Sequence, residues 1–146
     1  MHVPHNACVL VADGRKMLFF RNDGDSEYPN LKVEHAEEQS NPADRDQKTD
    51  AAGGASSTQG AAGGNMAEVD FHQQEEDRFA AQAADLLKRR ALSNDFETLI
   101  IVAPPRTLGE LRKHYHKEVE RRVSGELAKD LTNHPVDEIE KALHDA

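Results

Sequence analysis

Hydrophobic and polar positions along the first part of the chain predict a β-hairpin. Apolar runs at 7–12 and 16–21 flank the pair Asp13-Gly14. An Asp-Gly pair between two apolar runs is typical of a hairpin with a type I′ turn, which needs positive φ at both central positions. Because both runs are apolar on successive residues, we expect two strands that are covered on both faces of a sheet.

The pattern changes twice in the next part of the chain. Residues 31–36 alternate apolar and charged side chains, which predicts a third strand with one solvated face. Residues 37–50 are then polar and charged, and residues 51–64 contain five of the nine glycines. Such a composition cannot bury a core, so we predict a flexible Gly/Ala-rich loop at about 40–67.

Helical and strand-like patterns alternate over the rest of the chain. Asp70 followed by Gln73, and Thr107 followed by Glu110, both resemble capping boxes at helix starts. The expected elements, in order, are a helix over 71–91, a buried strand at 98–103, a helix opened by the Thr107–Glu110 capping box, an edge strand at 121–128 and a helix over 135–144.

Together these elements predict the fold class. Their order, βββ-loop-αβαβα, is typical of an α/β (α+β) fold with a mixed sheet of about five strands and helices on its faces. A length of 146 residues suits one domain, so we expect a single domain over 1–146.

Charge and composition argue against non-specific binding to nucleic acid and against insertion into a membrane. The formal net charge of −9 opposes non-specific attraction to nucleic acid or anionic lipid. No apolar run approaches the roughly 20 residues that span a bilayer, and the N-terminus lacks the basic region of a signal peptide. We therefore expect a cytoplasmic protein without membrane insertion. The single cysteine, Cys8, lies in an apolar run and is interpreted as a small buried side chain.

The segment Ala103–Arg112 is the first candidate for chemistry. A strand that ends at a proline pair and runs directly into a helix would place free backbone N–H groups beside Arg106 and Thr107. With Arg112, these residues form a candidate anion- or phosphate-binding site. The alternative is structural, namely a strand stopped by proline and followed by a capped helix.

A second candidate is the end of the expected loop, Gly63-Gly64-Asn65, just before the long helix. A loop of small residues can enter a narrow site, and an amide can position a water molecule. The alternative is a low-complexity linker. The eight histidines lack metal-ligand spacing, and no cofactor motif or complete catalytic set is present, so we expect no metal or cofactor and favour a non-catalytic protein.

Several segments of the chain together resemble one known family. They are Val9–Phe20, Asn41-Pro42, Arg45-Asp46, Thr49-Asp50, Phe79-Ala80, Lys129–Thr132 and, most specifically, Ala103-Pro104-Pro105-Arg106-Thr107-Leu108-Gly109-Glu110-Leu111-Arg112. The family is the bacterial host attachment protein family, and the resemblance covers about residues 6–144. It implies a binding or adaptor domain, with a protein partner and an oligomeric state that the sequence leaves open, needed indirectly for attachment to host cells.

The same resemblance carries an alternative function. The family is grouped with bacterial relatives of the central domain of archaeo-eukaryotic peptide-chain release factors, which resembles a ribonuclease-H-like mixed sheet. In release factors a Gly-Gly-Gln loop before a long helix promotes peptidyl-tRNA hydrolysis. Gly63-Gly64-Asn65 holds the comparable place here, but Asn is one methylene shorter than Gln, so no catalytic residue is assigned. The alternative is therefore a translation-associated domain that binds the ribosome or tRNA and promotes that hydrolysis.

Overall fold

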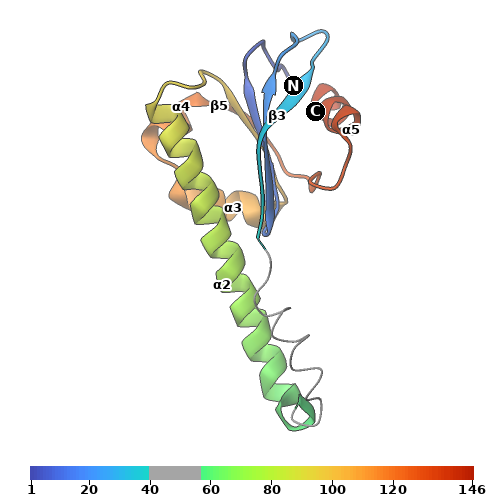
Figure 1. The fold of residues 1–146 in the computed structure, drawn as a ribbon, viewed down its shortest axis with the longest axis vertical. Helices are drawn as coiled ribbons and strands as arrows, with labels where there is room; N and C mark the ends of the chain where they lie inside the picture. The colour runs from blue at the N-terminus through green and yellow to red at the C-terminus, as the bar shows by residue number, and fades with distance from the viewer. Residues whose placement is uncertain (40–56) are drawn as a thin grey trace.

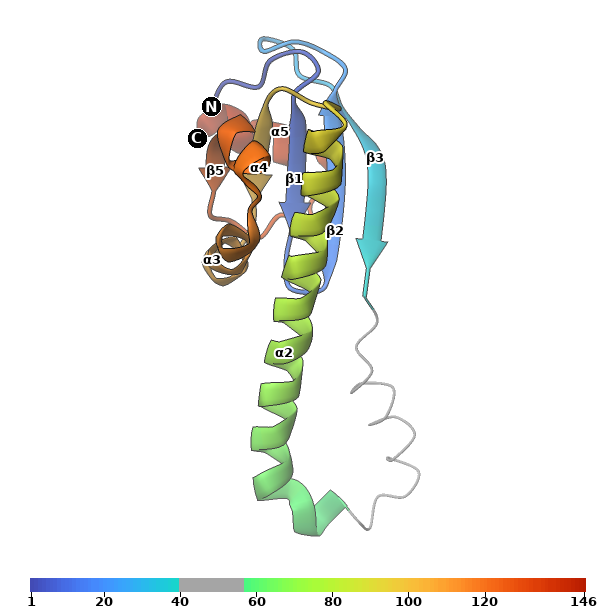
Figure 2. The ribbon, with the colours of Figure 1, turned by 90° about the vertical axis from the view of Figure 1, so that its left-hand side faces the viewer.

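The computed structural model describes residues 1–39 and 57–146, with the side chains of 1–39 and 70–146. In these residues five strands form one mixed sheet in the order β3-β2-β1-β4-β5 (Figure 2). The strands are β1 (Cys8–Ala12), β2 (Lys16–Asn22), β3 (Leu31–Glu38), β4 (Leu99–Val102) and β5 (Val123–Leu127). β2 pairs antiparallel with both β1 and β3, whereas β1 with β4 and β4 with β5 are parallel pairs. The predicted α/β class with a mixed sheet is confirmed.

Helices cover both faces of this sheet (Figure 1). Three of them, α2 (Ser57–Leu92), α3 (Pro105–His114) and α4 (Lys117–Arg122), lie on one face, and α5 (Val136–Asp145) lies on the other. One apolar cluster joins the sheet to α2, α3 and α4, and a second joins it to α5. Every residue of β1 is buried, as the continuous apolar run predicted.

The hairpin between β1 and β2 is confirmed, but its predicted turn type is wrong. No glycine in the described part of the chain has a positive φ, which a type I′ turn would require. Instead, the Asp13 carboxylate caps the turn, because its Oδ1 accepts hydrogen bonds from the N–H groups of Arg15 (2.8 Å) and Lys16 (2.7 Å).

β3 differs from the expected strand with one solvated face. Leu31 is buried, but Val33 is 56% exposed, and no later residue of β3 is buried. The reason is position, since β3 is an edge strand and only its first residue, Leu31, belongs to a buried apolar cluster. A β-bulge at Glu34 also shifts its register against β2.

α2 is longer than the predicted helix over 71–91. It begins at Ser57, so Asp70 is not its N-cap, and Gln73 donates to Asp77 (2.6 Å) instead. Residues 57–67 of the expected loop are therefore helical, and residues 40–56 lie outside the described residues. Among the side chains of α2 that the structure describes, 70–92, the buried ones lie from Phe79 to Ala91.

The second half of the chain departs from expectation at two helix starts. α3 has Pro104 at its N-cap and no side-chain cap, so the predicted Thr107–Glu110 capping box is wrong; Glu110 accepts from Lys113 instead. A short helix, α4, follows α3 and was not predicted. Its N-cap is His116, whose Nδ1 accepts from the N–H of Glu118 (3.0 Å). The edge position of β5 is confirmed.

Candidate anion-binding edge of the sheet

Three parallel strands bring the candidate residues to one edge of the sheet. β1, β4 and β5 run in the same direction, so their carboxyl ends lie together. In open α/β sheets this is the edge where ligands bind. The segments that leave this edge are the Asp13 turn, the start of α3 and residues 128–132, and the first half of α2 projects past it (Figure 2).

Arg106 and Thr107 lie at this edge, in the first turn of α3. Arg106 is exposed and has no ion-pair partner among the described residues, and Thr107 is half-buried. Because no side chain caps α3, the N–H groups of its first turn have no side-chain acceptor. These two predicted residues therefore do lie where an anion could be bound.

Arg112 does not join them. It lies in the last turn of α3, and its guanidinium binds Glu126 of β5 through Nη2 (2.6 Å) and Nε (3.0 Å). This hydrogen bond, together with the negative charge of Glu126, raises the pKa of Arg112 above its usual value. Arg112 is thus already occupied by a carboxylate and is an unsuitable anion ligand.

Sequence reasoning missed Lys129, which the fold places at the same edge. Leu127 lies opposite Val102 in the parallel pair of β5 and β4, so the residues that follow both strands are neighbours. Lys129 is exposed and, within the described part of the chain, forms no ion pair. The sequence could have indicated it only if the pairing of β4 with β5 had been known.

A hydrogen bond fixes the segment that carries Lys129. The buried Thr132 hydroxyl donates to Asp13 Oδ2 at 2.8 Å and lies 3.1 Å from Asp130 Oδ1. The chain after β5 is therefore attached to the turn between β1 and β2. This attachment fixes the segment at the edge, and the N–H of Ala103, just before α3, donates to the carbonyl of Leu127 (3.1 Å).

The basic run from Arg112 to Arg122 does not form a continuous positive surface. Lys113 pairs with Glu110 and Arg121 with Glu118, each at 2.7 Å. Arg122 is buried and donates to the carbonyl of Phe96. Most basic side chains of this run are consequently paired with a carboxylate or buried, and Arg106 and Lys129 are the better candidates for binding phosphate.

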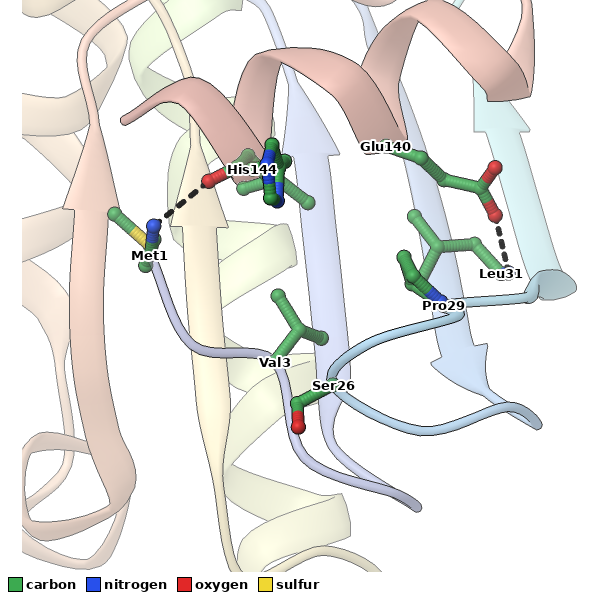
Figure 3. Close-up of a pocket in the computed structure, with 8 residues that line it drawn as sticks. Met1, Val3, Ser26, Pro29, Leu31, Glu140 and His144 are labelled. Atoms are coloured by element: carbon green, nitrogen blue, oxygen red, sulfur yellow. Dashed lines mark hydrogen bonds between the residues drawn. The ribbon is translucent and has the colours of Figure 1, made fainter.

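The pocket between the N-terminal segment and α5 is a packing feature (Figure 3). Its cavity of about 10 Å³ has room for about one water molecule. The nitrogen of Met1 donates to the carbonyl of Leu143 (2.9 Å), and Glu140 Oε2 accepts from the N–H of Leu31 (2.9 Å). These contacts attach α5 to the sheet.

The remaining candidates give no catalytic centre in the described residues. Burial raises the pKa of the Cys8 thiol to about 12, which makes it unreactive at neutral pH. No three His, Cys, Asp or Glu side chains in the described ranges are grouped as a metal site requires. Gly63, Gly64 and Asn65 lie in the helix α2, where a loop was expected, and their side chains lie outside the described residues.

A comparison with known protein families shows which family the chain belongs to. The family model described as bacterial archaeo-eukaryotic release factor family 12 matches residues 6–143. The chain belongs to this family. The predicted relation of the family 12 domain to release factors is thereby confirmed, whereas host attachment stays a prediction. No curated protein matches the chain. None of its described helices is long and apolar enough to cross a membrane.

Proposed function

We propose that this family 12 domain binds the translation machinery through the projecting half of α2 and the adjacent anion-binding edge, without releasing peptides itself. The observation that carries the proposal is the placement of α2. Its first half extends past the sheet, at the edge where Arg106 and Lys129 lie (Figure 2).

The length and anchoring of α2 support this role. A helix of 36 residues is about 54 Å long, and within its described side chains, 70–92, the buried ones lie from Phe79 onward. The second half thus anchors the helix on the sheet, and the backbone of the first half extends past the sheet, where we expect contacts with another molecule. Gly63-Gly64-Asn65 belongs to this first half and is helical, whereas the release-factor resemblance implies a loop before the long helix.

The chemistry of the edge fits an RNA backbone. Arg106, Lys129 and the N–H groups at the start of α3 are donors that suit phosphate oxygens. The whole molecule is acidic, so binding depends on this local group of donors. We expect the affinity to fall steeply as salt increases.

The proposal assigns binding to this domain but no catalysis. Asn65 has a shorter amide side chain than Gln, and its backbone is helical. We therefore expect binding to ribosomes or tRNA without hydrolysis of peptidyl-tRNA. A role in attachment to host cells, which the resemblance implies, would then be an indirect effect of translation.

The test is co-sedimentation of the full chain with stalled ribosome complexes, combined with a peptide-release assay. We expect salt-sensitive binding that falls at least about tenfold in the double variant Arg106→Ala/Lys129→Ala, with no release. Lys141→Ala, on α5 at the opposite face, is the matched control and should bind as the natural chain does. Absence of ribosome and tRNA binding would refute the proposal. Release that Asn65→Ala abolishes would refute its non-catalytic part.

A further inference from the structure

The edge strand β3 carries a self-complementary pattern of side chains. Its edge away from β2 is unpaired among the described residues, and Val33 is 56% exposed. Lys32, near its start, is exposed and forms no ion pair in the described part of the chain. Glu37 and Glu38, at its end, are exposed carboxylates.

We propose that β3 pairs antiparallel with β3 of a second copy of this chain, which joins two sheets into one across a twofold axis. The pairing we infer places Lys32 opposite Glu37 of the second copy and Val33 opposite Ala36. Opposite charges and apolar side chains that face each other directly across two strands stabilise a sheet.

The β-bulge selects this register. In the pairing with β2, Lys32 and Glu37 lie on the sheet face that α2 covers. Val33 and Ala36 lie on the face of α5. An unbroken strand would place residues 32 and 37 on opposite faces, but the extra residue at Glu34 brings them to the same face. Each Lys32 can therefore reach Glu37 of the other copy, and a pairing shifted by one residue would lose this match.

The bulge itself is accommodated at the twofold axis. Glu34 is held by Arg21 (2.9 Å) and Arg90 (3.3 Å), so its side chain is turned toward α2. Two short ladders, residues 31–33 against 36–38 of the other copy and the reverse, then flank the axis. Charged side chains and a bulge on an edge strand oppose pairing with unrelated strands. The same features are compatible with β3 of a second copy, because the charges and the bulges of the two strands match.

Space for the second strand is present beside α2. A groove of about 430 Å³ lies between α2 and the end of β3, lined by Glu37, Arg78, Gln82, Asp85 and Leu86. Lys32 of each copy, opposite Glu37 of the other, would point into the groove of that other copy. Arg78 is 62% exposed and Asp85 is 58% exposed, so both remain accessible to these incoming charges.

The test is sedimentation equilibrium of the full chain over a wide concentration range. We expect the natural chain to show a monomer–dimer equilibrium. Lys32→Glu and Glu37→Lys should each weaken the affinity of the dimer at least about tenfold, because each variant places like charges opposite each other twice. An equimolar mixture of the two variants should dimerise again, since both ladders then pair Lys with Glu. Circular dichroism spectra and thermal midpoints of the variants serve as the folding control.

The equimolar mixture of the two variants distinguishes charge pairing across the interface from a structural effect of each substitution. A purely structural effect of either substitution would persist in the mixture, whereas complementary pairing is restored. A chain that is monomeric at every concentration, or a dimer that neither variant weakens, would overturn the proposal. Self-association through β3 is measured separately from ribosome binding, which is tested through Arg106 and Lys129 beside β4 and β5.

Discussion

Asn94 has two roles at the end of α2. Its φ of 58° lies in the left-handed region, and the N–H groups of Asn94 and Asp95 bond back to the carbonyls of Ala91 and Arg90, both at 2.9 Å. This is the Schellman arrangement that ends many helices. Its Oδ1 also accepts from Arg122 Nη1 (3.1 Å), which connects the helix end to α4.

Substitutions of Asn94 should separate these two roles. Both Asn94→Gly and Asn94→Ala remove the Oδ1 acceptor of Arg122. Glycine adopts the left-handed backbone without strain, whereas alanine does not. We expect Asn94→Ala to have a free energy of unfolding about 1 kcal/mol lower than Asn94→Gly, because an alanine in the left-handed region is strained. Urea denaturation of both variants measures the difference. Equal stability of the two would show that the backbone conformation contributes nothing.

At the scale of the element, α2 has an anchored half and a projecting half. The helix predicted over 71–91 packs on the sheet through one face, since Phe79, Ala83 and Leu87 are all buried. The Asp70 capping signal was misleading because the helix continues past it to Ser57. A side chain that can cap a helix does so only where the chain actually turns, and local sequence does not decide that point.

Two leucines of α2 give a matched test of this anchoring. Leu87 is fully buried between the helix and the sheet, whereas Leu92, in the last turn, is 57% exposed. We expect Leu87→Ala to lower the free energy of unfolding by about 2–5 kcal/mol, because it leaves a cavity in the core. Leu92→Ala should change it by less than about 0.5 kcal/mol. Similar losses in chemical denaturation would mean that α2 does not anchor through this face.

At the scale of the whole molecule, the sequence predicted the fold class and, apart from α4, the order of the elements, but not which strands are neighbours in the sheet. Apolar runs indicated β1, β2 and β4, because burial follows local hydrophobicity, whereas alternation indicated β3. Lys129 was missed and Arg112 misjudged, because both depend on which strands pair: β5 beside β4 brings Lys129 to the binding edge and supplies Glu126 to Arg112. Such long-range pairing leaves no signal in a single segment.

The buried thiol at the centre of the sheet makes stability depend on alkaline pH. The pKa of Cys8 is raised from 9.0 to about 12, mainly by desolvation. The unfolded thiol ionises first as pH rises, so the stability due to Cys8 is complete below pH 9 and is lost progressively as pH rises toward 12. Between pH 8 and 10.5 we expect a loss of about 2 kcal/mol that Cys8→Ala lacks, measured by urea denaturation at both values. Equal losses in both proteins would place the cause elsewhere.

The pairing of β1 with β4 has a consequence for synthesis on the ribosome. Cys8 pairs with Leu99, so the fully apolar edge of β1 has no strand beside it until β4 has been made. From the end of β2 at Asn22 to Leu99, elongation takes roughly 4–15 seconds. During that interval β1 of the nascent hairpin is an unpaired edge strand that can pair with another chain. Newly made chains are therefore prone to aggregation until β4 emerges from the ribosome and pairs with β1.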